Sequence, residues 1–290
     1  MKARVTTGIQ FLRRMSAGGK TGAFILLAFV FVAAAASIIS LHPHRQISGP
    51  PLSPPGPSHW LGTDDLGVDL WAQICHGARV SLIIGLGTAL LAGLGGALAG
   101  ILAGYAGGLT DAVLMRLIDI MIVLPDLPVM IVLAAFFGPS LMTIVIVLSL
   151  FSWVHTARIV RSRVLSLKQR RYIHAAETFG AGMVYLMHRH FLPEIFPLAA
   201  VSMIRLTGRA IVAEAGLSFL GLGDPTSRSW GLIIHHATNF QGIYYTDFWT
   251  WWLLYPWLAL TLIVTALALV GRDLEKMADP RMMRGHGKPI

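Results

Sequence analysis

Residues Val80–Leu102, VSLIIGLGTALLAGLGGALAGIL, decide the fold class of this chain, because the stretch contains no charged side chain. An α-helix needs about 20 mainly apolar residues to cross the roughly 30 Å hydrocarbon core of a bilayer. A helix on the surface of a soluble domain would instead have one apolar and one polar face. The stretch therefore predicts a membrane-spanning helix and not a helix of a soluble core.

The rest of the chain has the same character. It is 55% hydrophobic and 13% charged, whereas soluble proteins average about 25% charged residues. Apolar runs predict six spans, at Thr21–Leu41, Val80–Leu102, Ala112–Phe137, Leu141–Ile159, Phe196–Leu220 and Phe248–Val270. We therefore expect an all-α fold, a polytopic membrane helix bundle with six transmembrane helices.

Lysine and arginine residues are distributed unequally around these spans. They cluster before the first span, between the fourth and fifth spans and after the sixth, whereas the other side offers only Arg45, Arg79 and Arg228. Cytoplasmic loops of membrane proteins carry the excess of basic residues. Both termini and the loop at about 161–193 are therefore predicted to be cytoplasmic. The net charge of +9 then reflects contact with anionic membrane lipid and not with nucleic acid.

The predicted organisation follows from these assignments. A cytoplasmic segment at 1–20 precedes a first transmembrane helix at 21–41, and a transmembrane core at 80–271 precedes a cytoplasmic tail at 272–290. The extracytoplasmic segment at 42–79 begins with a proline-rich strap, which favours extended backbone. Thr63 is predicted to cap a short helix at about Asp65–His76 that leads into the second span.

The basic loop contains Arg171–Pro193, RYIHAAETFGAGMVYLMHRHFLP. The adjacent alanines Ala175 and Ala176 would let another backbone approach closely. Gly180 can take a turn conformation that other residues resist. The pattern predicts a short helix at Tyr172–Gly182 presented to a partner, and an ordinary solvated loop is the alternative.

This loop resembles the EAA motif of the membrane subunits of bacterial ABC importers, in which Glu-Ala-Ala is followed by Gly and then by Leu-Pro. His174 stands where the motif has glutamate, and Glu177 lies one helical turn further on. The motif's ion pair with an ATPase is therefore not carried over to His174. Pro193 restricts Leu192 and predicts a boundary before the next helix. The resemblance implies an ATPase-coupling loop that includes Tyr172, His174, Ala175, Ala176, Glu177, Gly180, Leu192 and Pro193.

Two further segments narrow the resemblance. Leu61–Asp69, LGTDDLGVD, and Glu214–Gly223, EAGLSFLGLG, resemble segments of the dipeptide, oligopeptide and nickel permease group, second-subunit type. Val68 departs from that pattern, which usually has arginine there. The resemblance implies the type I importer permease fold, with this chain forming half of a pore for short peptides. A nickel or metal-chelate importer is the alternative within the group, and an ion-coupled secondary transporter is the alternative of another class.

The resemblance also implies an assembly in the bacterial inner membrane. A homologous permease subunit would complete a heterodimer, two ATPase subunits would bind ATP and Mg²⁺, and an extracytoplasmic binding protein would deliver the substrate. This chain has no GxxxxGK[ST] phosphate loop, so it is expected to be no enzyme and to bind no cofactor. Its histidines show no closed ligand spacing, so no metal site is predicted.

Charged residues inside the predicted spans are candidates for a gate or for the structure of the pore. A charge at the bilayer centre costs about 2.5–3.5 kcal/mol, so these side chains should face protein or water. Arg116 and Asp119 are three residues apart and can pair on one helix face. Pro125 and Pro128 should bend the third span. The candidates are Arg116, Asp119, Asp126, Arg209 and Glu214.

A glycine series in the second span provides a surface for close helix packing. The sequence leaves open whether that surface is internal or lies at a subunit interface. The series comprises Gly93, Gly95, Gly96, Gly100 and Gly104.

Overall fold

A computed structural model describes residues 15–278. Within that range the chain is helical, and its only β-type pairing consists of two isolated bridges. The elements are α2 (Ala17–Ile39), α3 (Leu70–Ala106), α4 (Gly108–Val123), α5 (Asp126–Phe137), α6 (Leu141–Lys168), α7 (Arg171–Thr178), α8 (Met183–Leu186), the π-helical turn η1 (Met187–Phe191), α9 (Leu192–Phe219), α10 (Trp230–Asn239), the 3₁₀ turn η2 (Gln241–Tyr244), α11 (Trp249–Trp252) and α12 (Leu254–Ala278).

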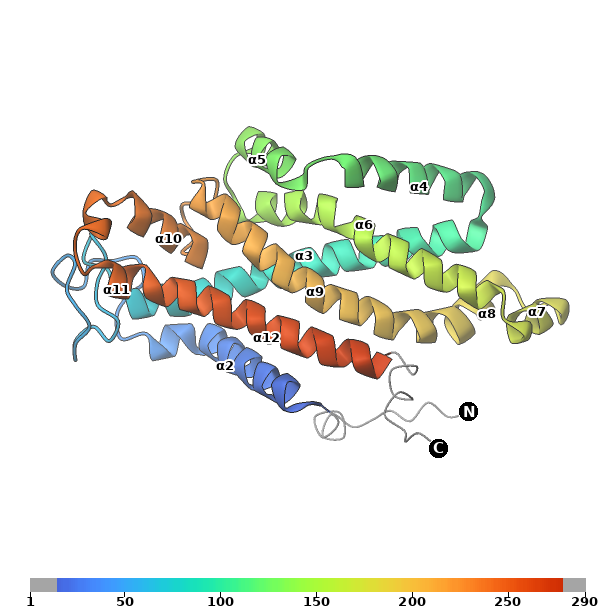
Figure 1. The fold of residues 1–290 in the computed structure, drawn as a ribbon, viewed down its shortest axis with the longest axis horizontal. Helices are drawn as coiled ribbons and strands as arrows, with labels where there is room; N and C mark the ends of the chain where they lie inside the picture. The colour runs from blue at the N-terminus through green and yellow to red at the C-terminus, as the bar shows by residue number, and fades with distance from the viewer. Residues whose placement is uncertain (1–14, 279–290) are drawn as a thin grey trace, which may run out of the picture.

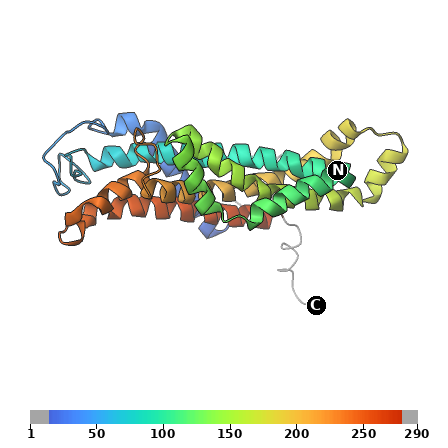
Figure 2. The same ribbon diagram turned by 90° about the horizontal axis from the view of Figure 1, so that it is seen from above.

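The predicted fold class is confirmed. Five stretches of the described chain are long and apolar enough to cross a membrane, and α4 with α5 adds a sixth if the bent pair counts as one span. The helices lie side by side in an elongated bundle (Figures 1 and 2). Of the predicted terminal segments 1–20 and 272–290, residues 1–14 and 279–290 lie outside the described residues.

The third predicted span, Ala112–Phe137, is two helices and not one. α4 ends at Val123, α5 begins at Asp126, and their axes differ by 90°. Pro125 has no amide hydrogen to continue the helix and forces Leu124 into extended backbone, at ψ 132°. Pro128 falls in the first turn of α5, where a missing amide is tolerated. The expected bend is therefore a complete break at Pro125.

Several helix ends also differ from the predictions. The expected short helix at Asp65–His76 and the second span are one continuous helix, α3. Asp69, and not Thr63, caps it, because the Asp69 carboxylate accepts a hydrogen bond from the Ala72 amide at 2.9 Å. α6 continues past Ile159 to Lys168 because no glycine or proline interrupts it. The predicted spans were ended where polar side chains appear in the sequence, but the helices of the structure continue through these polar residues.

The glycine series of α3 serves internal packing. A β-carbon added at Gly96 would lie 2.4 Å from the Trp153 carbonyl oxygen, and one at Gly100 would lie 2.5 Å from the Ala157 carbonyl oxygen. A β-carbon added at Gly93 would contact the side chain of Met203 on α9, whereas one added at Gly95 would lie in open space. The backbones of α3 and α6 therefore touch along most of this stripe, and α3 forms the centre of the bundle with α6 and α9 on it.

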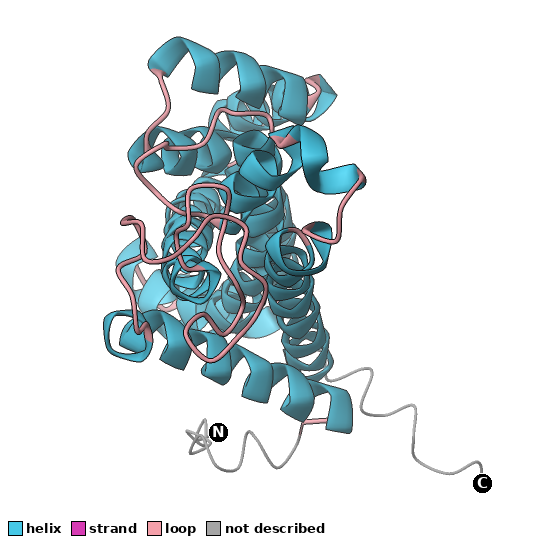
Figure 3. Cartoon of the chain, turned by 90° about the vertical axis from the view of Figure 1, so that its left-hand side faces the viewer, coloured by secondary structure: helices cyan, strands magenta, loops and turns pink. Residues whose placement is uncertain are grey.

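The two ends of the bundle are built differently. One end carries α10, α11 and residues 40–69, which we call the cap, and Figure 3 looks onto this end. The other end carries residues 169–191, which include α7, α8 and η1 and which we call the tip (Figure 1). The start of α2 lies beside the end of α12, where the Ser16 amide donates a hydrogen bond to the Asp273 carboxylate at 2.7 Å. Both helix ends lie toward the tip.

Candidate functional site

The tip projects from the bundle on one buried anchor. Ile173 of α7 is fully buried and packs in one cluster with Val164 and Leu167 of α6 and with Leu186 and Phe191 from the turns that follow. The other residues of α7 are exposed except for the half-buried Ala176. A movement of α7 is thus transmitted to α6 through this contact.

Gly180 ends α7 in the conformation that the sequence predicted. Its φ is +82°, its amide bonds the Glu177 carbonyl, and the Ala181 amide bonds the Ala176 carbonyl. This pair of hydrogen bonds is the Schellman arrangement, which requires a left-handed residue after the helix. The helix itself is shorter than the predicted Tyr172–Gly182, since it runs from Arg171 to Thr178.

The prediction for Leu192 and Pro193 was wrong. Leu192 has helical backbone, at φ −56° and ψ −44°, and the chain is helical without a break from Val184 to Phe219. Pro193 follows the wide π-helical turn η1 and lies in the first turn of α9, where proline's missing amide costs little. The pair therefore marks a change of helix type and not a boundary between helices.

Several large apolar or aromatic side chains are exposed on the tip. Phe179 is 91% exposed, and Tyr172 on α7 and Val184 and Tyr185 on α8 are also exposed. Ala175 is exposed, so a partner's backbone can approach α7 there. Sequence reasoning missed Phe179 and Val184, although two large apolar residues in a basic loop were a usable signal. An exposed apolar patch of this kind is typical of a contact surface.

His174 and Glu177 face each other on α7. The His174 Nδ1 atom lies 3.5 Å from a Glu177 carboxylate oxygen, and both side chains are largely exposed. His174, which stands where the EAA motif has glutamate, therefore interacts with Glu177 within the helix.

Ion pairs join the helices on the tip side of the bundle. Arg161 of α6 makes a two-pronged contact with Asp111 of α4, at 2.5 and 2.6 Å. Arg158 of α6 pairs with Asp119 of α4 at 2.5 Å. Arg116, which was expected to pair with Asp119, forms no ion pair within residues 15–278, because Asp119 turns to α6 instead. These contacts hold α4 to α6.

The next ion pairs extend the connection across the bundle. Arg163 of α6 pairs with Glu194 of α9 at 2.5 Å, and Arg205 of α9 pairs with Glu275 of α12. α4, α6, α9 and α12 are thus linked in series. Each exposed pair contributes little alone, but together they fix how the helices are aligned.

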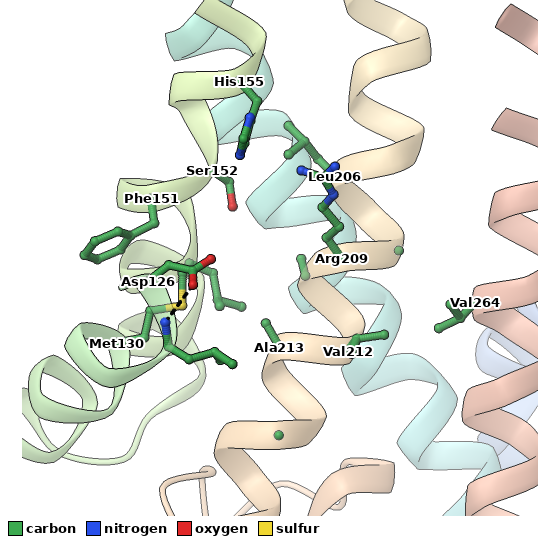
Figure 4. Close-up of a pocket in the computed structure, with 15 residues that line it drawn as sticks. Asp126, Met130, Phe151, Ser152, His155, Leu206, Arg209, Val212, Ala213 and Val264 are labelled. Atoms are coloured by element: carbon green, nitrogen blue, oxygen red, sulfur yellow. Dashed lines mark hydrogen bonds between the residues drawn. The ribbon is translucent and has the colours of Figure 1, made fainter. Parts of the chain in front are cut away.

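A pocket of about 520 Å³ lies between α5, α6 and α9. Asp126 reaches into it from the α4–α5 break, Ser152 and His155 from α6, and Arg209 from α9 (Figure 4). Its remaining walls are mostly apolar, with Met130, Phe151, Leu206 and Val264 among them. Two of the predicted intramembrane charges, Asp126 and Arg209, therefore share one space near the middle of the bundle.

Glu214 lies outside this pocket. Its carboxylate is buried and accepts a hydrogen bond from the Ser218 hydroxyl at 2.6 Å, and Ser218 in turn contacts Ser229, the residue that caps α10. This arrangement holds α10 against α9. Glu214 therefore supports the contact between α9 and α10 and does not line the pocket.

The cap is held by buried acidic side chains. The Asp64 carboxylate accepts hydrogen bonds from the Leu66 and Val68 amides at 3.0 and 2.8 Å and from the Gln73 amide at 2.7 Å. Asp69 pairs with His59 at 3.0 Å. Over residues 15–278, no three His, Cys, Asp or Glu side chains are grouped so that they could hold a metal ion.

Comparisons with known proteins agree with this architecture. Residues 96–284 match the family described as binding-protein-dependent transport system inner membrane component. The dipeptide transport system permease protein DppC of Bacillus subtilis is 38% identical over 270 residues, which cover 91% of this chain and 82% of that protein. The oligopeptide transport system permease protein OppC of Bacillus subtilis is 33% identical, over 80% of this chain and 74% of that protein. A putative peptide transport system permease protein of Brucella suis is 36% identical, over 96% of this chain and 92% of that protein.

Proposed function

Because this chain belongs to the binding-protein-dependent transport system inner membrane components and is a permease subunit of a peptide ABC importer, we propose that it forms half of a pore driven by a separate ATPase. A homologous permease subunit supplies the other half, and an extracytoplasmic binding protein delivers the peptide at the cap. ATP and Mg²⁺ bind on two ATPase subunits and not on this chain. A permease subunit is not itself an enzyme.

The tip is the proposed seat for the ATPase. The observation that carries this assignment is the exposed Phe179 directly after α7, together with Tyr172 on α7 and Val184 on α8. The buried Ile173 fixes α7 to the bundle. Large exposed apolar side chains on a rigid support are typical of the centre of a binding surface. The Ala175 position, which has no bulk, lets the partner's backbone approach.

The proposed orientation places the tip in the cytoplasm of a bacterium and the chain in its inner membrane. The lysine and arginine residues favour this orientation, and it agrees with the position of the α2 start and the α12 end near the tip (Figure 1). Both termini are then cytoplasmic, and the cap faces the binding protein.

The ion pairs provide a route by which ATPase closure could move the pore. Force on α7 reaches α6 through Ile173, passes to α4 through Arg161 and Arg158, and reaches α9 through Arg163. The α4–α5 break at Pro125 means that α4 and α5 do not form one straight helix, so α4 can change its angle to α5 when α6 moves. Because the pocket lies between α5, α6 and α9, such a movement would change its width.

Short peptides are the proposed substrates. The similar proteins described above are dipeptide, oligopeptide and peptide permeases, which favours peptides over nickel or a metal chelate. Most of the selectivity is expected to reside in the binding protein that delivers the peptide.

Substitution of Phe179 tests the seat directly. We expect Phe179→Ala to weaken binding of the ATPase subunits by about tenfold or more, as truncation of a central aromatic anchor commonly does. Binding is measured by titrating purified ATPase subunits onto the permease pair in nanodiscs. Phe179 is 91% exposed, so the folded permease should keep its thermal midpoint.

Tyr245→Ala is the matched control. Tyr245 is an aromatic residue that is 90% exposed, but it lies at the cap end of the bundle. It should leave ATPase binding unchanged. Equal effects of the two substitutions, or no effect of Phe179→Ala, would contradict the assignment of the tip.

A further inference from the structure

The pocket presents opposite charges from two of its walls. Asp126 extends from the α4–α5 break and Arg209 from α9, and both point into the same space (Figure 4). Neither side chain forms an ion pair with another residue of the described range 15–278. Asp126 and Arg209 therefore form no ion pair in the described part of the chain, and Ser152 and His155 of α6 are the other polar side chains labelled in the pocket.

This lack of ion-pair partners sets Asp126 and Arg209 apart from the charges that join neighbouring helices, although Arg116 also has no ion pair in the described range. Asp111, Asp119 and Glu275 are each paired with an arginine of a neighbouring helix. A charge at membrane depth is costly unless it faces water, a partner or a ligand. Two unpaired charges of opposite sign in one pocket are suited to a ligand that carries both signs.

Most of the wall around the two charges is apolar, with Ser152 and His155 of α6 as polar exceptions. Met130 and Phe151 lie on the side of α5 and α6, and Leu206 lies beside Arg209 on α9. A volume of about 520 Å³ is within the usual range of small-molecule pockets, which are typically apolar with a few polar groups that fix orientation. The combination matches a short molecule with an ammonium group, an apolar middle and a carboxylate.

We propose that this pocket binds a short peptide transiently during its passage, with the peptide's α-ammonium group on Asp126 and its α-carboxylate on Arg209. The inference rests on the proposed function and adds a substrate site to it. Arginine holds carboxylates through two parallel hydrogen bonds, so it supplies the stronger and more directional contact. The apolar walls can accept varied peptide side chains. The site therefore recognises the two charged ends of the peptide and not its sequence.

The test measures peptide binding to the assembled permease–ATPase complex in nanodiscs, without the binding protein. The probe is the dipeptide Ala-Phe, compared with the same dipeptide amidated at its C-terminus, by saturation-transfer NMR and competition titration. We expect weak, saturable binding of free Ala-Phe. Arg209→Gln should weaken it at least about tenfold and change binding of the amidated form less than about twofold, because the amide has no carboxylate to lose.

Asp126→Asn gives the reciprocal test with N-acetylated Ala-Phe. It should weaken free Ala-Phe binding and leave the acetylated form, which has no ammonium group, almost unchanged. Arg205→Gln is the matched control, since Arg205 lies one turn from Arg209, pairs with Glu275 and does not line the pocket. Its Ala-Phe affinity should equal that of the wild type.

Three results would overturn the site. The first is that Ala-Phe shows no saturable binding. The second is that the substitutions weaken binding of the free and the blocked peptides equally. The third is that Arg209→Gln separates the two permease subunits and leaves peptide binding unchanged. The last result would make these charges intersubunit ion pairs. ATPase binding and its stimulation by loaded binding protein are measured in the same nanodiscs. If stimulation is intact and Ala-Phe does not bind, only the site fails, whereas absence of ATPase binding contradicts the proposed function itself.

Discussion

The cap and the tip lie at opposite ends of the same bundle. The acidic side chains Asp64 and Asp69 of the cap are buried and hydrogen-bonded, whereas most residues of α7 in the tip are exposed. In the cap, Asp64 is 4% exposed and accepts three hydrogen bonds, and Asp69 both caps α3 and pairs with His59. In the tip, Ile173 is the one buried residue of α7, and Phe179, which follows that helix, is 91% exposed. The cap is thus stabilised by contacts within this chain, whereas the proposed function assigns the exposed side chains of the tip to contact with the ATPase.

This difference predicts opposite outcomes for substitutions at the two ends. Changes in the cap should lower the stability of the chain itself. Changes in the tip should leave that stability intact and act on coupling. The following variants are arranged from the largest expected effect to the smallest.

Asp64→Ala should have the largest effect. It leaves three buried or half-buried donors without an acceptor, and we expect a loss of about 3–5 kcal/mol in unfolding free energy. The measurement is the thermal midpoint of the purified permease in detergent. Asp65→Ala is the control, since Asp65 is exposed at the next position. Equal midpoints for the two variants would mean that the cap does not depend on Asp64.

Gly180→Val should act on the tip without unfolding the chain. A β-branched residue at φ +82° costs about 1–2 kcal/mol, which should loosen the end of α7. We expect about tenfold weaker ATPase binding with an unchanged thermal midpoint. Gly182→Val lies in the same turn, at a position with open space and no positive φ, and should be nearly silent. Similar losses in both variants would show that bulk in the loop, and not the backbone conformation of Gly180, is responsible.

Acid should weaken the cap by a smaller amount. Burial lowers the pKa of His44 to about 4, helped by His76, Arg45 and Arg228, so the folded chain resists a proton that the unfolded chain accepts near pH 6.5. Stability contributed by neutral His44 is therefore complete above about pH 6.5 and is lost as the pH falls toward 4. Burial also lowers the pKa of His236, and this shift adds to the loss of stability at low pH.

The pH effect is measured as the thermal midpoint of wild type and His44→Gln between pH 7 and pH 4. As the pH falls, the thermal midpoint of the wild type should decrease more than that of His44→Gln. Partial burial of the Asp65 carboxyl group, helped by the neighbouring Asp64, raises the pKa of Asp65. This shift acts on stability in the opposite direction, so the difference between the wild type and the variant is the informative quantity. Identical pH profiles would contradict the assignment to His44.

His174→Glu should have the smallest effect. Because His174 already interacts with Glu177 within α7, the change introduces a repulsion of at most about 0.5 kcal/mol on an exposed helix. We expect an unchanged thermal midpoint and ATPase affinity within about twofold of wild type, measured by the same titration. A large change in affinity would mean that residue 174 contacts the ATPase directly.

Local features of this fold could be predicted from the sequence. Apolar runs located the helical regions, the prolines of residues 43–57 indicated a non-helical strap, and Gly180 indicated the end of α7. Each of these is set by the residue itself or by its immediate neighbours. The intervening polar residues were less informative, because Arg79 and Arg161 continue α3 and α6 instead of ending them.

Contacts between helices could not be predicted in the same way. Periodicity identifies residues that share a face of one helix, so it suggested Arg116 as the ion-pair partner of Asp119. It cannot show that Arg158 of the neighbouring helix α6 is the partner instead. The 90° angle at Pro125 and the π-helical turn before Leu192 depend on packing that the sequence does not state. The pocket between Asp126 and Arg209 likewise requires three helices to be placed together.

The order in which the cap's contacts arise along the chain has a consequence for its biosynthesis. Its internal hydrogen bonds, such as those from Leu52 to the Asp64 carbonyl and from Gln73 to the Asp64 carboxylate, join residues made close together in time. These contacts can form on the far side of the membrane while later helices are still being translated. Two others must wait, because Arg45 bonds the Thr226 carbonyl and Trp251 packs on Gly62. A nascent chain truncated before Thr226 should therefore carry a folded segment at residues 40–69 that is not yet attached to α10, α11 and the rest of the bundle.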